Sequence, residues 1–279
     1  MPPTTPAPAL RILMLHGYTQ SGPLFTSKTR ALAKLLQTAF PSSTLSFPTA
    51  PHRLSTTDLP SYDPTIPIST SLIPAEESGA LAGTAPDGTD EPAAYAWFRR
   101  PTRDSTEIVG LDGGFEALAE VLRKEGPFDG VVGFSQGGAM AALLASVLEP
   151  GRWAHFGPST AAFPVSFRPT EAGPIHPPFK FAVIYSGFRL AGAEHDAFYA
   201  GGLATPTCHF IGSVDTVVEE KRSLALAELC EKPRVVYHPG GHFLPSGKQY
   251  VGALVGWLRE VLAPPEKKEE DASEMDMPF

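Results

Sequence analysis

A serine between glycines is the first feature of this sequence that could do chemistry. Gly133-Phe134-Ser135-Gln136-Gly137 fits the pattern GxSxG, and it lies between an apolar run typical of a strand and a small-residue run typical of a helix. A nucleophile elbow requires that context, because its sharp strand-to-helix turn exposes the serine hydroxyl. Larger side chains in place of the glycines would collide with the strand and the helix. Ser135 is therefore the candidate nucleophile, and a tight turn with an incidental serine is the alternative.

A serine hydroxyl needs two partners to act as a nucleophile at neutral pH. A histidine must accept its proton, and an acid must orient that histidine. Asp215 follows one predicted strand and His242 follows another, so that Ser135, Asp215 and His242 occur in the chain order of an α/β-hydrolase. Because ligand sites in open α/β sheets collect at the carboxyl ends of the strands, we expect the three side chains to meet there.

Other acidic residues compete with Asp215 for the orienting role. Asp196 and Glu194 do not directly follow a predicted strand, and the Glu219-Glu220 pair lies inside a predicted helix. Asp215 comes directly after the strand predicted over residues 207–212, which places it at the expected edge of the sheet. We therefore favour Asp215.

His238 is the rival of His242 for the base, because it too follows the last predicted strand. The Gly240-Gly241 pair before His242 allows a sharp loop that would aim an imidazole back at the nucleophile. The other histidines lie in predicted loops or strand interiors, where a histidine is usually a surface or core residue. We favour His242 and keep His238 as the alternative.

Acyl transfer also needs hydrogen-bond donors for a tetrahedral oxyanion, and backbone N–H groups supply them without reorganisation. The amide of Gln136 opens the helix after the nucleophile and is the first candidate. The second is expected in the loop after the first predicted strand, where His16-Gly17-Tyr18-Thr19 occupies the HG-type position. Tyr18 is the preferred donor there and Thr19 the second choice, and a simple strand-ending turn is the alternative.

Predicted strands and helices alternate along the chain. Strands are expected at residues 11–15, 44–47, 130–134, 181–186, 207–212 and 234–237, and helices at residues 25–40, 111–124, 139–149, 218–230 and 249–262. Parallel strands need crossover connections, so this order predicts an α/β fold: a doubly wound, mostly parallel sheet with helices on both faces. We expect a single domain over residues 10–263, which is the architecture of an α/β-hydrolase.

Four segments interrupt or flank this pattern. Residues 54–98 contain seven acidic residues, six prolines and no Lys or Arg, which predicts a lid-like insertion near the substrate entrance or, alternatively, a mobile surface loop. Residues 150–178 form a second proline-rich loop. Residues 1–9 read as an N-terminal tail, and residues 264–279 as a disordered acidic tail.

Composition excludes several classes of function. The 279 residues carry a formal net charge of -8, which argues against a nucleic-acid partner. Because the insertion contributes -7 and the tail -4, the rest of the chain carries -8 + 11 = +3. The two cysteines suggest buried thiols, with neither a disulfide framework nor a zinc site. No apolar run reaches the ~20 residues that span a bilayer, and no secretory signal is recognisable, so we expect a cytoplasmic protein.

Several motifs together carry a family resemblance: Leu15-His16-Gly17-Tyr18, Pro51-His52, Gly133-Phe134-Ser135-Gln136-Gly137, Gly212-Ser213-Val214-Asp215 and Gly240-Gly241-His242-Phe243-Leu244-Pro245. Their order and the GGHxxP ending resemble the fungal family of serine hydrolases (FSH), within the α/β-hydrolases. The resemblance covers about residues 11–262.

The resemblance implies a cofactor-free esterase or thioesterase acting on a small-molecule acyl ester or thioester, with Ser135, Asp215 and His242 as its triad. Some similar members release acyl or polyketide chains from acyl carrier proteins in fungal biosynthetic pathways, and others are broad carboxylesterases. The alternative from another class is a catalytically silent scaffold that binds an apolar ligand or a protein.

Overall fold

The chain folds around a parallel β-sheet. The computed structural model describes residues 8–55, 58, 94–101, 105, 107–158 and 162–264. The sheet has the strand order β2-β1-β5-β6-β7-β8, and every neighbouring pair is parallel. Its strands are β1 (Arg11–Leu15), β2 (Thr44–Ser46), β5 (Gly130–Phe134), β6 (Phe181–Tyr185), β7 (Thr207–Gly212) and β8 (Pro233–His238). Each lies within one residue of its predicted ends.

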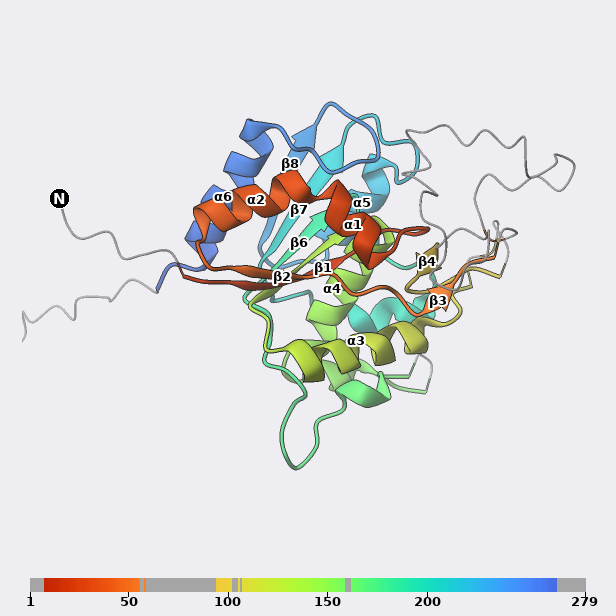
Figure 1. Cartoon of the computed structure of the whole chain (residues 1–279). Helices are drawn as coiled ribbons and strands as arrows, with labels where there is room; N and C mark the ends of the chain where they lie inside the picture. The colour runs from red at the N-terminus through yellow and green to blue at the C-terminus, as the bar shows by residue number, and fades with distance from the viewer. Residues whose placement is uncertain are drawn as a thin grey trace, which may run out of the picture.

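Helices cover both faces of the sheet (Figure 1). One face carries α1 (Gly22–Lys28), α2 (Arg30–Ala39) and α6 (Lys248–Val261), and the other carries α3 (Leu111–Glu125), α4 (Gln136–Leu148) and α5 (Glu220–Ala227). Alternate strand residues point to opposite faces, so Ile12 and Met14 join one apolar core while Leu13 and Leu15 join the other. The predicted doubly wound arrangement is confirmed.

The first helical region differs from its prediction. One helix is expected over residues 25–40, but the chain breaks it at Thr29 into α1 and α2. The hydroxyl of Thr29 donates to the carbonyl of Phe25 at 2.7 Å, and the Thr29 backbone adopts φ -100° and ψ 12°. A threonine hydroxyl that bonds back to the carbonyl four residues earlier often bends a helix. Both helices still present their apolar side chains to the same face of the sheet.

The ends of the proline-rich insertion form a small antiparallel pair, β3 (His52–Arg53) with β4 (Tyr95–Ala96). Residues 56–57 and 59–93 lie outside the described residues, so the lid stays a prediction. The same holds for most of the two predicted tails. The second proline-rich loop contains the short 3-10 helices η3 (Arg152–His155) and η4 (Val165–Phe167).

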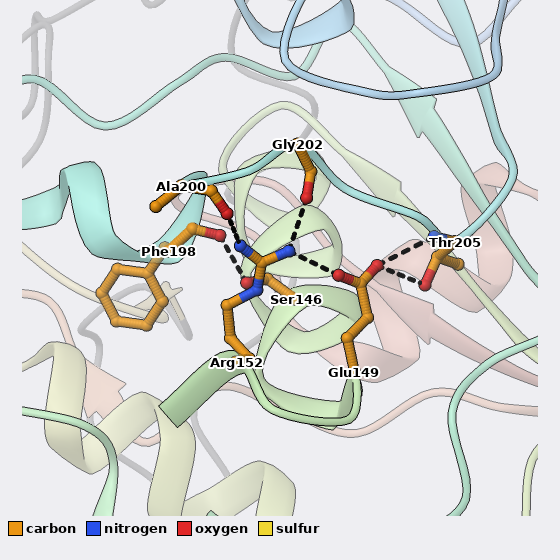
Figure 2. Close-up of polar contacts among 7 residues, drawn as sticks. All are labelled: Ser146, Glu149, Arg152, Phe198, Ala200, Gly202 and Thr205. Atoms are coloured by element: carbon orange, nitrogen blue, oxygen red, sulfur yellow. Dashed lines mark hydrogen bonds and ion pairs between the residues drawn. The ribbon is translucent and has the colours of Figure 1, made fainter. Parts of the chain in front are cut away.

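The end of α4 far from the serine is held by a buried ion pair (Figure 2). The Arg152 guanidinium contacts the Glu149 carboxylate and donates to the carbonyls of Ala200 and Gly202. The other carboxylate oxygen of Glu149 accepts from the backbone N–H and the hydroxyl of Thr205, at 2.8 and 2.9 Å. This network fixes the loop that leads into β7, the strand before Asp215.

Candidate active site

Ser135 lies at a strained turn between β5 and α4. Its backbone has a φ of +54°, in a region that side chains rarely adopt, and its N–H donates to the carbonyl of Tyr185 at 2.8 Å. A Cβ atom on Gly133 would lie 2.1 Å from the carbonyl oxygen of Gly137, and one on Gly137 would lie 2.2 Å from that of Leu15. The two glycines are therefore required by close backbone approach, as the GxSxG pattern predicts.

Ser135, His242 and Asp215 form a continuous hydrogen-bonded chain. His242 Nε2 lies 2.9 Å from Ser135 Oγ, and His242 Nδ1 lies 2.8 Å from Asp215 Oδ2. Because a carboxylate only accepts, Nδ1 carries the proton and Nε2 is free to accept from the serine hydroxyl. The imidazole also packs on the ring of Phe134, with 4.9 Å between ring centroids. The arrangement can activate a serine oxygen.

Asp215 is held by backbone donors as well as by the histidine. Its Oδ1 accepts from the N–H groups of Val217 and Val218 at 2.9 and 2.8 Å. Burial alone would raise the pKa of the Asp215 carboxyl, but the His242 hydrogen bond and charge and the Val218 N–H outweigh it and hold the pKa below its ordinary value. The carboxylate therefore stays ionised at neutral pH and fixes the tautomer of His242.

The competing acids lie elsewhere. Asp196 and Glu194 lie on the 3-10 helix η5 (Ala193–Phe198). Asp196 forms an ion pair there with Arg189, which precedes this helix. Glu219 pairs with Lys221 at 2.6 Å at the start of α5. Within the part of the chain that is described, none of these acids contacts His242. The structure brings Asp215 to the histidine and leaves the alternatives apart.

The rival histidine, His238, is the last residue of β8 and is buried between the rings of Phe243 and Tyr250. Among the described residues, neither of its ring nitrogens has a hydrogen-bond partner. Burial lowers the pKa of His238, and the charge of Asp215 opposes that shift. His238 is therefore a buried neighbour of the acid, while His242 alone of the two reaches Ser135.

The two predicted oxyanion donors are a backbone amide of the elbow and one of the loop after β1. Gln136 is the first residue of α4, where N–H groups have no acceptor within the helix. In the loop after β1, the Thr19 N–H donates to the carbonyl of Tyr95 at 3.0 Å and the Gly17 N–H donates to Gln20 Oε1 at 3.1 Å. The Tyr18 N–H has no partner among the described residues. Of the two predicted donors in this loop, Tyr18 remains available and Thr19 is occupied.

Sequence reasoning missed one contact of this site. The segment after β4, expected only as the end of the insertion, lies against the elbow, where the Gln136 side chain bonds to the backbone of Trp97 and Phe98. Because 39 residues separate Trp97 from Gln136, no local pattern signals the contact.

Neither a metal-binding cluster nor a membrane-spanning helix occurs in the part of the chain that the structure describes. No group of three or more His, Cys, Asp or Glu side chains in it is arranged to hold a metal ion. No helix there is both long and apolar enough to cross a bilayer.

Comparisons with known proteins agree on one family. The serine hydrolase (FSH1) family matches residues 6–254. Esterase OVCA2 of Danio rerio is 31% identical over 251 residues, covering 86% of this chain and 92% of that protein. Family of serine hydrolases 3 of Saccharomyces cerevisiae is 27% identical over 268 residues, covering 95% and 90%.

A third relative is longer than this chain. A protein of Schizosaccharomyces pombe named dihydrofolate reductase is 33% identical over 242 residues, covering 86% of this chain. The matched part is 45% of that protein, so the chain spans less than half of its length.

Solved structures share the fold. Esterase PE8 superposes with a TM-score of 0.55 at 19% identity, covering 92% of this chain and 94% of its own. Acyl-protein thioesterase 2 of Zea mays superposes with a TM-score of 0.52 at 20% identity, covering 93% and 97%. Together with the doubly wound parallel sheet, these likenesses identify the α/β-hydrolase fold.

Proposed function

The chain belongs to the serine hydrolase (FSH1) family, and from that premise we propose that it hydrolyses carboxylic esters or acyl thioesters through an acyl-enzyme on Ser135. The observation that carries this proposal is the chain of hydrogen bonds from Asp215 through His242 to Ser135, at 2.8 and 2.9 Å. Such a chain supplies both requirements of a serine nucleophile, a proton acceptor and a group that orients it.

Acylation begins when Ser135 Oγ attacks the substrate carbonyl carbon. His242 Nε2 accepts the hydroxyl proton, and the Asp215 carboxylate stabilises the imidazolium that results. The carbonyl oxygen becomes an oxyanion that accepts from the backbone N–H groups of Gln136 and Tyr18. When the intermediate collapses, the bond to the leaving alcohol or thiol breaks, and His242 returns the proton to that group.

Deacylation repeats the same steps with water as the nucleophile. His242 takes a proton from water as its oxygen attacks the acyl carbon, and the same two amides hold the second oxyanion. Collapse breaks the bond to Ser135 Oγ, which recovers its proton from His242. A free carboxylic acid leaves, and no redox partner or metal enters the balance.

A fluorophosphonate probe tests the nucleophile. Wild-type protein is expected to be labelled covalently at Ser135, while Ser135→Ala stays unlabelled and loses ester hydrolysis. Ser146→Ala is a matched control, because Ser146 is also buried and lies near the opposite end of the same helix, α4. Equal labelling of wild type and Ser135→Ala would contradict the proposal.

Apolar side chains around the site support an acyl substrate. Val214 and Val217 flank Asp215, Phe243 follows His242, and all three side chains are exposed. Exposed apolar groups gathered beside a catalytic centre are typical of a surface that contacts an apolar ligand. We therefore propose that the acyl chain of the substrate lies along these residues.

A more specific form of the proposed function is the release of an acyl or polyketide chain from an acyl carrier protein. Matched substrates test it. Oxygen esters, pantetheine thioesters and carrier-bound thioesters of one acyl length are compared by kcat/KM. Faster turnover of the carrier-bound thioester than of the pantetheine thioester supports a carrier partner. Equal rates limit the substrate to small molecules, and no turnover of any of them by folded protein that has not met the probe favours the silent scaffold.

A further inference from the structure

The Gln136 side chain has a task separate from that of its backbone amide. It is buried beside the elbow, and both ends of its amide contact the segment that follows β4. Oε1 accepts from the N–H of Trp97 at 2.8 Å, and Nε2 donates to the carbonyl of Phe98 at 2.8 Å. A primary amide can satisfy one donor and one acceptor of a neighbouring backbone in this way. The side chain thus ties the elbow to residues 97–98.

Trp97 connects the same segment to the loop after β1. Its indole Nε1–H donates to the carbonyl of His16 at 3.0 Å, and its ring lies 5.3 Å from the imidazole of His16. The imidazole is fixed in turn, because His16 Nε2 accepts from the N–H of Ala50 at 3.0 Å and Nδ1 lies 2.8 Å from the carbonyl of Gly17. Trp97 and His16 are both fully buried, so this contact has little room to move.

Backbone pairing strengthens the connection between the loop and β4. The N–H of Thr19 donates to the carbonyl of Tyr95 at 3.0 Å, and the N–H of Tyr95 donates to the carbonyl of Gln20 at 3.1 Å. On the other side, α3 packs so closely that a Cβ atom on Gly114 would lie 2.3 Å from the Trp97 carbonyl oxygen. Residues 95–98 are therefore held between the loop, the elbow and α3.

From these contacts we infer that the side chains of Gln136 and Trp97 are positioning residues for the oxyanion hole. This inference rests on the proposed function. One donor of the hole, the Gln136 N–H, belongs to the elbow, and the other, the Tyr18 N–H, belongs to the loop. Residues 97–98 join the two through Gln136 on one side and through His16 on the other, and so set the spacing of the two donors.

Donor spacing matters mainly in the transition state. The two N–H groups must lie about 2.7–3.1 Å from the position that the oxyanion takes, and a displacement of about 1 Å can cost roughly a hundredfold in rate. The ground-state carbonyl makes weaker demands on that geometry, because only part of the negative charge is present before attack. Loss of the contact should therefore lower kcat with little change in KM.

Two variants and a transition-state analogue test the inference. Gln136→Met keeps the length of the side chain but loses both hydrogen bonds, and Trp97→Phe keeps an aromatic ring but loses the donor to His16. We expect each to lower kcat about ten- to a hundredfold with KM within about threefold. A trifluoromethyl ketone forms a hemiketal oxyanion on Ser135, so its Ki should rise by the same factor as kcat/KM falls.

Matched controls separate positioning from general damage. Gln37→Met removes a glutamine side chain on α2 whose one hydrogen bond among the described residues is to the Ser43 carbonyl, and Trp153→Phe changes an exposed tryptophan. Both should keep wild-type kcat and Ki. Gln136→Glu keeps the acceptor for Trp97 but replaces the donor to Phe98 with a charged acceptor, so it should restore no kcat.

Particular results would overturn the inference. These are unchanged kcat and Ki in a folded Gln136→Met or Trp97→Phe, or a change in KM alone. If Gln136→Met does not fold, Trp97→Phe decides. Wild-type protein without fluorophosphonate labelling would instead contradict the proposed function, so the two failures are distinguishable.

Discussion

Ser135 combines a strained backbone with a well-placed side chain. A positive φ at a non-glycine residue costs on the order of 1–3 kcal/mol, and such strain persists only where surrounding structure enforces it. Here the enforcement comes from the backbone on both sides, since Gly133 and Gly137 allow approaches that no Cβ atom would permit. The sequence pattern predicts this turn because both glycines that it requires lie within two residues of Ser135.

The two histidines near Asp215 differ in the groups that they contact. His242 bridges the acid and the serine, whereas His238 is buried at the end of β8. We expect His242→Ala to lower kcat by about 10⁴-fold or more, because the serine loses its proton acceptor. His238→Ala should lower kcat less than tenfold. Steady-state hydrolysis of one ester by both variants, with circular dichroism as the check on folding, makes the comparison.

The reverse order, a greater loss in His238→Ala than in His242→Ala, would assign the base to His238. Ser135→Ala in the same assay gives the residual rate of hydrolysis that remains without the nucleophile.

At the scale of elements, the fold was predictable wherever burial is continuous. All five residues of β5 and of β6 are buried, which produces the unbroken apolar runs from which these strands are predicted. The break at Thr29 was not predictable, because it accompanies a back-bond from one threonine hydroxyl that no periodic pattern signals. The contact of Gln136 with Trp97 likewise depends on tertiary packing.

The buried pair at the far end of α4 leads to a prediction about stability. Glu149→Gln removes the charge that compensates Arg152, and an unpaired buried guanidinium should lower the free energy of unfolding by about 3 kcal/mol. Glu120→Gln is the matched control, because it removes a carboxylate from an exposed pair with Lys124 on α3. Exposed pairs contribute little, so that variant should unfold like wild type. Urea unfolding at neutral pH measures both.

Equal stability of Glu149→Gln and Glu120→Gln would show that the ion pair of Figure 2 does not stabilise the fold. Hydrolysis by both variants, well below their unfolding temperatures, should match wild type, since Ser135 lies at the opposite end of α4.

For the whole molecule, buried neutral histidines tie stability to pH. Burial lowers the pKa of His16 to about 4, with the Gly17 carbonyl opposing the shift, and burial lowers the pKa of His209 to about 4 as well. His209 Nε2 lies 3.6 Å from the Sγ of Cys230, whose pKa is raised to about 11 by burial, so no negative charge compensates a protonated ring. Both histidines are therefore neutral in the folded protein at neutral pH.

The sign of the effect follows from proton binding. Between pH 6.5 and 4 the unfolded chain protonates these two side chains and the folded chain does not, so unfolding takes up protons and stability falls as pH falls. Each histidine lowers the free energy of unfolding by about 3 kcal/mol across that interval, because one pKa unit corresponds to about 1.4 kcal/mol. Two such losses approach the total stability of an ordinary domain, about 5–15 kcal/mol.

We therefore expect the free energy of unfolding to be constant between pH 7 and 8 and to decline below pH 6.5. His209→Asn should flatten that decline by about 3 kcal/mol, since it removes one of the two protonation steps. His155→Asn, at an exposed position, should keep the wild-type slope. Urea unfolding followed by circular dichroism at pH 7.5, 6.0 and 4.5 measures the three slopes. The same slope in His209→Asn as in wild type would mean that this histidine is not held neutral by the fold.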